Sequence, residues 1–365
     1  MDAIKRFIDV YVPVTTCTLR CHYCYITQHR LFEGALPKFK YSPSYVRQAL
    51  SKKRLGGTCL INLCGGGETL LAPQLTEYIR ELLEEGHYVM VVTNATVTKR
   101  FDEIAEFPRE LLSHLFFKFS YHYMELKKRN LLEVFFQNVC KMRDAGASFT
   151  LEATPSDELI PYIDEMQEAA LTHAGAINHI TIGRDERVPG ELPILTNMSR
   201  EEYKKTWSVF HSEFFDYKMS IFGVKRKEFC YAGAWSLYVN LGTGDASQCY
   251  CSYFHQNIFE DISKPIIFKP IGNNCKQEHC YNGHAFLVLG LIPELPAPTY
   301  GEIRNRVCTD GTEWLKPEMK SFMSTKLYES NKEYSWVGKI EANAEIRLLD
   351  LARRIKGKMK RIVHK

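Results

Sequence analysis

Short apolar runs alternate with amphipathic stretches over the first 183 residues. In the stretch 72–85, for example, Leu75, Ile79, Leu82 and Leu83 recur at helical spacing, and Gly86 follows as a stop signal. Runs of four to eight apolar residues between such stretches predict buried strands. Six strands alternating with helices predict a parallel sheet with right-handed crossovers. The predicted strands are 7–14, 58–63, 87–93, 114–121, 148–153 and 178–183.

Turn residues mark several of the predicted helix ends. Ser42 followed by Pro43 is typical of an N-cap with proline in the first turn, and predicts a helix to about residue 54. Gly146 closes a long amphipathic stretch that begins at residue 125. Further helices are predicted at 99–106 and 156–173.

The alternation stops after about residue 200. We expect a linking helix over 201–217, and then a hairpin of 235–241 and 247–253 around the glycines of 242–244. The stretch 293–300 is rich in proline, and 314–330 looks partly helical. Residues 342–360 predict a final helix, followed by a strongly basic end. The predicted division is 1–220, 221–310 and 311–365.

Composition indicates an ordinary globular protein. The 365 residues are 45% hydrophobic and 25% charged, and the net charge of +4 is too small to indicate nucleic-acid binding. The longest late apolar run, 286–293, is too short to span a bilayer. No apolar leader precedes the first strand, and twelve cysteines in so large a chain are not typical of a secreted disulfide framework. We therefore expect a reducing cytoplasm.

Three cysteines, Cys17, Cys21 and Cys24, lie within eight residues directly after the first predicted strand. Three thiolates on one short loop can hold three irons of a cubane cluster and leave the fourth iron free for a substrate or cofactor. A zinc site, or a group of core thiols, is the alternative interpretation. Tyr23 stands just before the last of these cysteines.

This Cys-x3-Cys-x2-Cys segment with its aromatic residue resembles the cluster loop of radical S-adenosylmethionine (radical SAM) enzymes. The resemblance implies a partial (β/α)6 barrel, a [4Fe-4S] cluster on Cys17, Cys21 and Cys24, and SAM chelated to the open iron. In that family an electron passed through the cluster cleaves SAM, and the resulting 5′-deoxyadenosyl radical abstracts hydrogen from a substrate. Tyr23 belongs to the implied SAM-binding loop.

A glycine-rich segment, Gly65-Gly66-Gly67-Glu68, follows the second predicted strand. Successive glycines let a ligand approach the backbone and leave amide N–H groups to bond it. Radical SAM enzymes carry a similar Gly-Gly-Glu-Pro segment here, which contacts the amino group of SAM. This chain has Thr69 in place of the proline. The alternative is a plain strand-to-helix turn.

Polar residues at other strand ends are weaker candidates. In a parallel α/β sheet the carboxyl ends of the strands build the site. Asn94, Ser120 and Glu152 follow or end the third, fourth and fifth strands, and the resemblance implies contacts from such positions to SAM. A turn cap is the alternative for each. The charged run 184–187 predicts a solvated loop. In the alternative interpretation it faces the substrate.

A second group of cysteines follows residue 220. Cys230, thirteen residues, Gly244, four residues and Cys249 resemble the start of the auxiliary-cluster module of SPASM and twitch radical SAM enzymes. With Cys275 and Cys280 these thiols suit one auxiliary [4Fe-4S] cluster, of the shorter, twitch-like form. Structural zinc is the alternative, because thiolate spacing does not separate zinc from iron.

The other cysteines leave the ligand set open. Cys251 could take the place of Cys249, and Cys308 could replace one of the later pair. Cys59, Cys64 and Cys140 lie in strand or helix patterns, which predicts buried, inert thiols.

The resemblance implies an oxidoreductase or maturase with the auxiliary cluster as electron acceptor. The first hypothesis is hydrogen abstraction from a peptide or protein side chain. The alternative substrate is a small hydroxylated molecule, such as an amino sugar or cyclitol, and a zinc-binding adaptor is the non-enzymatic alternative. An electron donor such as flavodoxin or ferredoxin is expected. The basic residues from Arg353 onward suit an acidic partner or substrate, or form a solvated helix.

Overall fold

The computed structural model describes residues 3–188 and 190–363, and its centre is one nine-stranded sheet. The strand order is β6-β5-β4-β3-β2-β1-β7-β8-β9. All neighbours from β6 to β7 pair in parallel, and β8 and β9 are antiparallel additions. The strands are β1 (Arg6–Val12), β2 (Cys59–Gly65), β3 (Tyr88–Thr93), β4 (Leu115–Ser120), β5 (Ser148–Ala153), β6 (His179–Ile180), β7 (Ser236–Asn240), β8 (Asp245–Ser247) and β9 (His255–Asn257).

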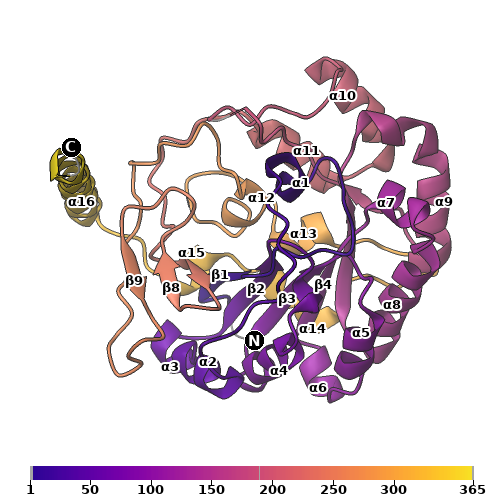
Figure 1. The fold of residues 1–365 in the computed structure, drawn as a ribbon, viewed down its shortest axis with the longest axis horizontal. Coiled ribbons are helices and arrows are strands. Elements are labelled where there is room, and N and C mark those ends of the chain that lie inside the picture. The colour runs from indigo at the N-terminus through magenta and orange to yellow at the C-terminus, as the bar shows by residue number, and fades with distance from the viewer. Residues whose placement is uncertain (1–2, 189, 364–365) are drawn as a thin grey trace.

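Helices follow the first five strands and lie around the outside of the sheet (Figure 1). The predicted α/β class with a largely parallel sheet is confirmed, and the arrangement is that of a partial barrel. The helices are α1 (Tyr25–His29), α2 (Pro43–Ala49), α3 (Lys52–Leu55), α4 (Leu75–Glu84), α5 (Thr98–Ala105), α6 (Arg109–Leu112), α7 (Tyr123–Lys128), α8 (Leu132–Ala145), α9 (Ile163–Ala174), α10 (Arg200–Trp207), α11 (Glu213–Ile221), α12 (Gly283–Phe286), α13 (Tyr300–Arg304), α14 (Pro317–Met323), α15 (Leu327–Ser330) and α16 (Trp336–Val363). Three short 3-10 helices are η1 (Thr69–Leu71), η2 (Asp157–Tyr162) and η3 (Ser208–Phe210).

Four helix predictions differ from the structure. The helices predicted to residue 54 and over 201–217 each split into two, α2 with α3 and α10 with α11. The stretch predicted as one helix from 125 to 145 is two helices, α7 and α8, because Asn130 adopts a left-handed φ of 55° between them. The helix predicted over 156–173 starts as η2, which contains Pro161, and becomes α-helical only at α9. The predicted cap at Ser42 is confirmed, since its side chain accepts a hydrogen bond from the amide of Tyr45.

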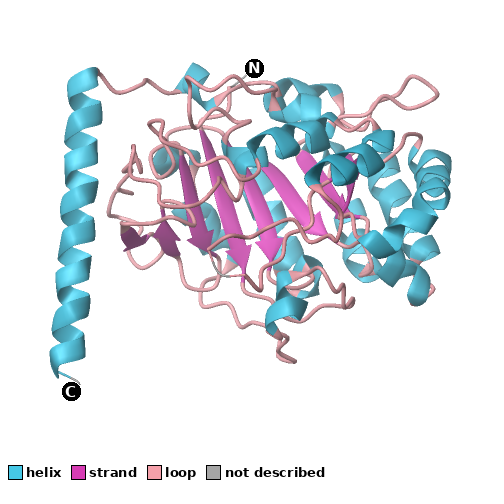
Figure 2. Cartoon of the chain, turned by 90° about the horizontal axis from the view of Figure 1, so that it is seen from above, coloured by secondary structure: helices cyan, strands magenta, loops and turns pink. Residues whose placement is uncertain are grey.

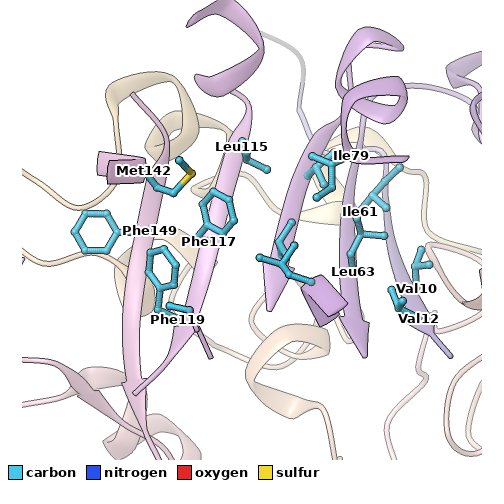
Figure 3. Packing of buried hydrophobic residues seen from close by; sticks show 14 of the residues in the cluster. Val10, Val12, Ile61, Leu63, Ile79, Leu115, Phe117, Phe119, Met142 and Phe149 are labelled. Carbon is cyan, nitrogen blue, oxygen red and sulfur yellow. The ribbon is translucent and has the colours of Figure 1, made fainter. Parts of the chain in front are cut away.

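The two faces of the sheet have different chemistry because side chains alternate along each strand. The outward face is apolar, and Figure 3 shows Val10, Ile61 and Phe117 among the side chains that pack with Ile79 of α4 and Met142 of α8. These residues are fully buried. This layer fixes the strands and thereby the loops at their carboxyl ends.

The inner face is apolar only at the amino ends of the strands. There Phe7, Leu60 and Phe116 belong to one core with residues of α13 and α14. Tyr88 stacks on Phe322 of α14 with ring centroids 3.7 Å apart. Residues 300–323 therefore close this end of the barrel, and the polar inner positions lie further along the strands.

Strand β7 connects the later part of the chain to the barrel. Phe7 of β1 pairs with Ser236, so β7 extends the parallel sheet at its β1 edge. The hairpin predicted around 242–244 is confirmed, with β7 and β8 antiparallel, but its second strand is 245–247 and not the predicted 247–253. The division at residues 220 and 310 stays a prediction. In the part of the chain that the structure describes, no helix is both long and apolar enough to cross a membrane.

Candidate active site

The first cysteine group lies on the loop between β1 and α1. Cys17, Cys21 and Cys24 border one cavity of about 80 Å³ together with the glycine segment and Asn94. The predicted convergence of this loop with the carboxyl ends of the next strands is what a parallel sheet produces. Cys21 is buried, and the other two thiols are partly exposed.

The glycines bring the second loop against the first. The amide of Gly67 donates to the carbonyl of Val14 over 2.5 Å, and the amide of Glu68 donates to the carbonyl of Thr16 over 2.9 Å. A Cβ atom at position 67 would lie 2.1 Å from that Thr16 oxygen. Glycine is therefore required here by backbone packing. The expectation that these two amides are free to bind a ligand is wrong, because they already have carbonyl partners.

Glu68 holds the β2 and β3 loops together. Its buried carboxylate accepts hydrogen bonds from the amide of Leu70 (3.0 Å), the hydroxyl of Thr93 (2.5 Å) and the amide of Asn94 (2.8 Å). Burial raises the pKa of Glu68, and these three donors act in the opposite direction. The carboxylate still borders the cavity, and its predicted contact to SAM stays a prediction.

Asn94 connects this frame to the cysteine loop. Its side-chain amide donates to the hydroxyl of Thr18 over 2.9 Å and approaches the Sγ of Cys17 at 3.6 Å. The amide of Leu19 also donates to that sulfur, over 3.5 Å. Such N–H groups stabilise a thiolate bound to iron and tune its cluster. The donor set therefore fits the predicted cluster.

The three thiols of this loop are neutral in the absence of metal. Burial raises the pKa of Cys17 to about 11, and burial also raises the pKa values of Cys21 and Cys24. Because metal binds the thiolate, loading must release protons at neutral pH.

The other predicted SAM residues divide into two classes. Ser120 borders the same cavity as the cysteines. Tyr23 does not border the cavity, but its hydroxyl bonds to Nδ1 of His122, which does, over 2.8 Å. Glu152 instead pairs with Lys118 at 3.1 Å and with the buried Arg304. Its contact to SAM stays a prediction, and the structure does not bring it to the cysteine cavity.

His122 also borders the cavity and was not predicted from the sequence. It follows β4 by two residues, so the strand-end rule that selected Ser120 could have found it. Burial lowers its pKa to about 4, which keeps the ring neutral.

A second group of cysteines comes from the segments before β7, between β8 and β9, and before α12. Five thiols border a small cavity of about 40 Å³ that is also lined by Phe286, Leu287 and Ile292. The structure thus brings the four predicted auxiliary ligands together and adds a fifth thiol. The five are Cys230, Cys249, Cys251, Cys275 and Cys280.

Cys308 does not border this cavity. Its thiol donates to the carbonyl of Ala174 over 3.5 Å, and it packs against Gly175 at the end of α9. The alternative in which Cys308 replaces a later auxiliary ligand is therefore wrong.

Backbone bonds tie the second group together. Cys230 and Gly272 exchange two backbone hydrogen bonds of 3.1 and 3.0 Å. The amide of Cys251 donates to the Sγ of Cys249 over 3.2 Å, and the amide of Lys276 approaches the Sγ of Cys251 at 3.5 Å. Within the described residues, no three Cys, His, Asp or Glu side chains are arranged around a single metal ion. A cubane makes a different demand, because each thiolate binds its own iron.

A larger chamber of about 490 Å³ lies between the two cysteine groups. It shares Gly65 and Val92 with the first cavity, and Tyr250, Tyr281 and Asn282 with the second. This shared lining makes the chamber the space that both groups can reach.

Polar side chains of the inner sheet face form the floor of the chamber. The carboxylate of Asp9 accepts hydrogen bonds from Asn62 (2.7 Å), Asn282 (3.2 Å) and the hydroxyl of Tyr250 (3.4 Å). Burial raises the pKa of Asp9. Burial also lowers the pKa of Lys118, another lining residue, to about 8. The chamber therefore holds an acid and a base that both titrate closer to neutrality than usual.

Comparison with solved structures finds similar chains of low identity. SuiB of Streptococcus suis bound to S-adenosylmethionine is 14% identical with a TM-score of 0.49, and the match covers 71% of this chain. It covers 64% of SuiB, less than two thirds of that chain. Native anSMEcpe with bound AdoMet and Cp18Cys peptide is 12% identical with a TM-score of 0.47, and the match covers 96% of this chain and 99% of anSMEcpe.

Comparison with curated proteins finds no match. A family model, described as the radical SAM superfamily, matches residues 11–156. This segment begins in β1 and ends just after β5, so it contains Cys17, Cys21 and Cys24 and the glycine segment. Residues 11–156 of the chain therefore match a radical SAM domain.

Proposed function

We propose that the protein is a radical SAM enzyme of the SPASM/twitch type, an oxidoreductase or maturase with one auxiliary cluster. The observation that carries the proposal is the chamber that shares walls with both cysteine groups. A substrate in this chamber would be within reach of both.

The first group would hold the SAM-binding [4Fe-4S] cluster on Cys17, Cys21 and Cys24. When bound, the cluster and SAM supply a 5′-deoxyadenosyl radical that abstracts hydrogen from the substrate. The chain's own residues orient these groups: Asn94 donates toward Cys17, and Glu68 fixes Asn94. Flavodoxin or ferredoxin would supply the electron.

The second group would hold an auxiliary [4Fe-4S] cluster on Cys230, Cys249, Cys275 and Cys280, as an electron acceptor. Its apolar surroundings exclude water. Cys251 would be a neighbour that bonds Tyr253 and Lys276.

The proposed substrate is a peptide or protein side chain that enters the chamber. The chamber walls favour a second candidate, a small hydroxylated molecule such as an amino sugar or cyclitol. Asp9 and Asn62 present hydrogen-bonding groups side by side on β1 and β2, Lys118 adds another from β4, and six tyrosines supply apolar surfaces with polar tips. A volume of about 490 Å³ lies in the usual range for small-molecule sites.

Within the chamber, the chain's residues would exclude water and hold protons. The core around Tyr88 and Phe322 closes the amino end of the barrel, so solvent does not enter from that side. The carboxyl group of Asp9 is placed to hold or accept a proton at the chamber floor, because its pKa is raised by burial.

The first test is metal content and SAM cleavage after anaerobic reconstitution. We expect about eight irons in the wild type and about four in the Cys17→Ala/Cys21→Ala/Cys24→Ala variant. 5′-Deoxyadenosine should form with dithionite and SAM only in the wild type. Absence of iron and of 5′-deoxyadenosine in the wild type, with zinc in both groups, would favour the adaptor alternative.

The fifth thiol gives a matched pair of variants. We expect Cys249→Ala to lose about four irons and Cys251→Ala to keep about eight. The reverse result would make Cys251 the ligand in place of Cys249.

The substrate is tested by the 5′-deoxyadenosine yield of the reconstituted enzyme. Amino sugars and cyclitols form one panel, and peptides form the other. Stimulation by the first panel that is lost in Asn62→Leu would support the small-molecule candidate. Stimulation by peptides alone would support the side-chain candidate.

A further inference from the structure

Helix α16 carries an apolar stripe on its outward face. Val337, Ile340, Leu348, Leu351 and Ile355 recur three, four, seven or eight positions apart, so they lie on one side of the helix. Each of these side chains is between 47% and 67% exposed. Isolated exposed apolar residues are common on protein surfaces, but a continuous stripe of this length marks an interaction site.

The opposite face of α16 packs on the body of the molecule. Ile346 is buried there, and the side chain of Asn343 accepts a hydrogen bond from the amide of Asn273 over 2.9 Å. Ion pairs join Asp350 to Lys276 at 2.8 Å and Glu345 to Lys269. Figure 2 shows the helix along one edge of the molecule, with the rest of the chain on one side only.

Charges on α16 are sorted in the same way. The acids Glu345 and Asp350 are neutralised by lysines of the body, and Asp350 also pairs with Arg354. Arg347 is exposed, next to Leu348 of the stripe. After residue 355 the sequence adds cations without any acid, namely Lys356, Lys358, Lys360, Arg361 and Lys365. Glu341, an exposed acid near the stripe, lies in the first half of the helix. The positive charge is therefore concentrated in the second half.

We propose that α16 is a membrane-docking helix that lies in the interface of an anionic lipid bilayer. A helix with an apolar stripe and a cationic polar side inserts its apolar face at the level of the headgroups, and its cations attract anionic lipids. Trp336, 77% exposed at the start of the helix, is a residue type that favours this interface. The proposal concerns docking only and is independent of the proposed catalytic function.

Charge favours a membrane over a second copy of the chain as the occupant. Parallel pairing of two α16 helices would place two cationic halves side by side, which costs free energy. Antiparallel pairing would offer each cationic half little more than the exposed acid Glu341. An anionic bilayer is complementary to that half and takes up the apolar stripe as well.

Co-sedimentation with vesicles tests the proposal. The purified full chain should bind vesicles of phosphatidylcholine with phosphatidylglycerol, and bind pure phosphatidylcholine much less. In Leu348→Asp/Leu351→Asp, binding should fall by about tenfold or more, because two leucines that would insert into the bilayer are lost. Arg347→Gln/Arg354→Gln should weaken binding and reduce its dependence on salt. The control Leu171→Asp/Val209→Asp changes two exposed apolar residues elsewhere and should bind like the wild type.

Three results would overturn the proposal. One is a wild type that does not bind the anionic vesicles. Another is equal loss of binding in the control variant. The third is light scattering that shows a wild-type dimer and a Leu348→Asp/Leu351→Asp monomer, which would assign the stripe to a second copy. Circular dichroism of each variant separates loss of docking from loss of fold.

Discussion

The first cysteine group lies on one loop of eight residues, whereas the second is gathered from three separate segments of the chain. The first is held by a frame of polar side chains around Glu68. The second is held by backbone bonds, such as the pair between Cys230 and Gly272, and by apolar side chains. A site on one loop can be recognised from spacing alone, but a gathered site depends on the fold that brings its segments together.

Replacing one cysteine in each group should produce the largest effect on iron content and SAM cleavage. The two variants together separate the roles of the two groups. Cys21→Ser should abolish formation of 5′-deoxyadenosine and lose about four irons. Cys280→Ser should also lose about four irons but still cleave SAM, because the first group is intact. Iron analysis and a 5′-deoxyadenosine assay on the same samples check both expectations. If Cys280→Ser failed to cleave SAM although its first cluster was fully occupied, the two cysteine groups would not be independent.

The close packing of the two first-group loops is tested by Gly67→Ala. The new Cβ would meet the Thr16 carbonyl oxygen at 2.1 Å, and backbone cannot yield as a flexible side chain can. We expect a loss of at least about 3 kcal/mol in the free energy of unfolding, as for strong overpacking. Denaturant unfolding measures it. Gly34→Ala is the control, since nothing lies within 4 Å of its new Cβ.

The Gly67→Ala variant also compares the two cysteine groups. The second group should keep its iron, because the strained contact lies in the first group only. Equal loss from both groups would mean that the frame of the first group also supports the second.

Acid should weaken both regions together if they share one cooperative sheet. His87, fully buried before β3, accepts from the amide of Cys59 and donates to the carbonyl of Leu50. Burial lowers its pKa from 6.5 to about 4. Between these values the unfolded chain binds more protons, so stability is full above pH 6.5 and falls as the pH falls toward 4. The loss from this group is about 3 kcal/mol at most.

The measurement is the pH dependence of unfolding free energy in wild type and His87→Gln. The variant lacks the imidazole and should lose this part of the slope, while other buried histidines contribute equally to both proteins. Hydrogen exchange of β1 to β4 and of β7 to β9 should respond alike. Exchange that rises in β7 to β9 alone would divide the sheet into two units.

The sequence carried most of the first site because its signals are local. Strand β5 was predicted with its observed bounds, and the loop of Cys17, Cys21 and Cys24 meets the glycine segment as expected. What could not be predicted depends on contacts between distant segments. Cys308 and Cys280 look alike in the sequence, and only the path of the chain puts one beside Ala174 and the other in the second group.

The same limit applies to single polar residues. Glu152 and Asn94 both stand at strand ends, yet Glu152 is taken by Lys118 and the buried Arg304. No local signal shows that an arginine 152 positions later in the chain will pair with it. The glycine segment borders the cavity, but the amides of Gly67 and Glu68 bond backbone carbonyls rather than remain free.

The smallest effect should come from a single hydroxyl in the frame of the first group. Thr93 donates to Glu68 over 2.5 Å and accepts from the amide of Ala95 over 3.1 Å. Thr93→Val keeps the shape but removes both bonds, and a buried carboxylate loses one of its three donors. We expect a cost of about 1–2 kcal/mol in unfolding free energy. Thr93→Ser keeps the hydroxyl and should stay near the wild type. Among the described contacts, none joins the second cysteine group to this hydroxyl. Thr93→Val should therefore weaken iron retention by the first group only. Equal weakening in both groups would show that they are coupled through β3.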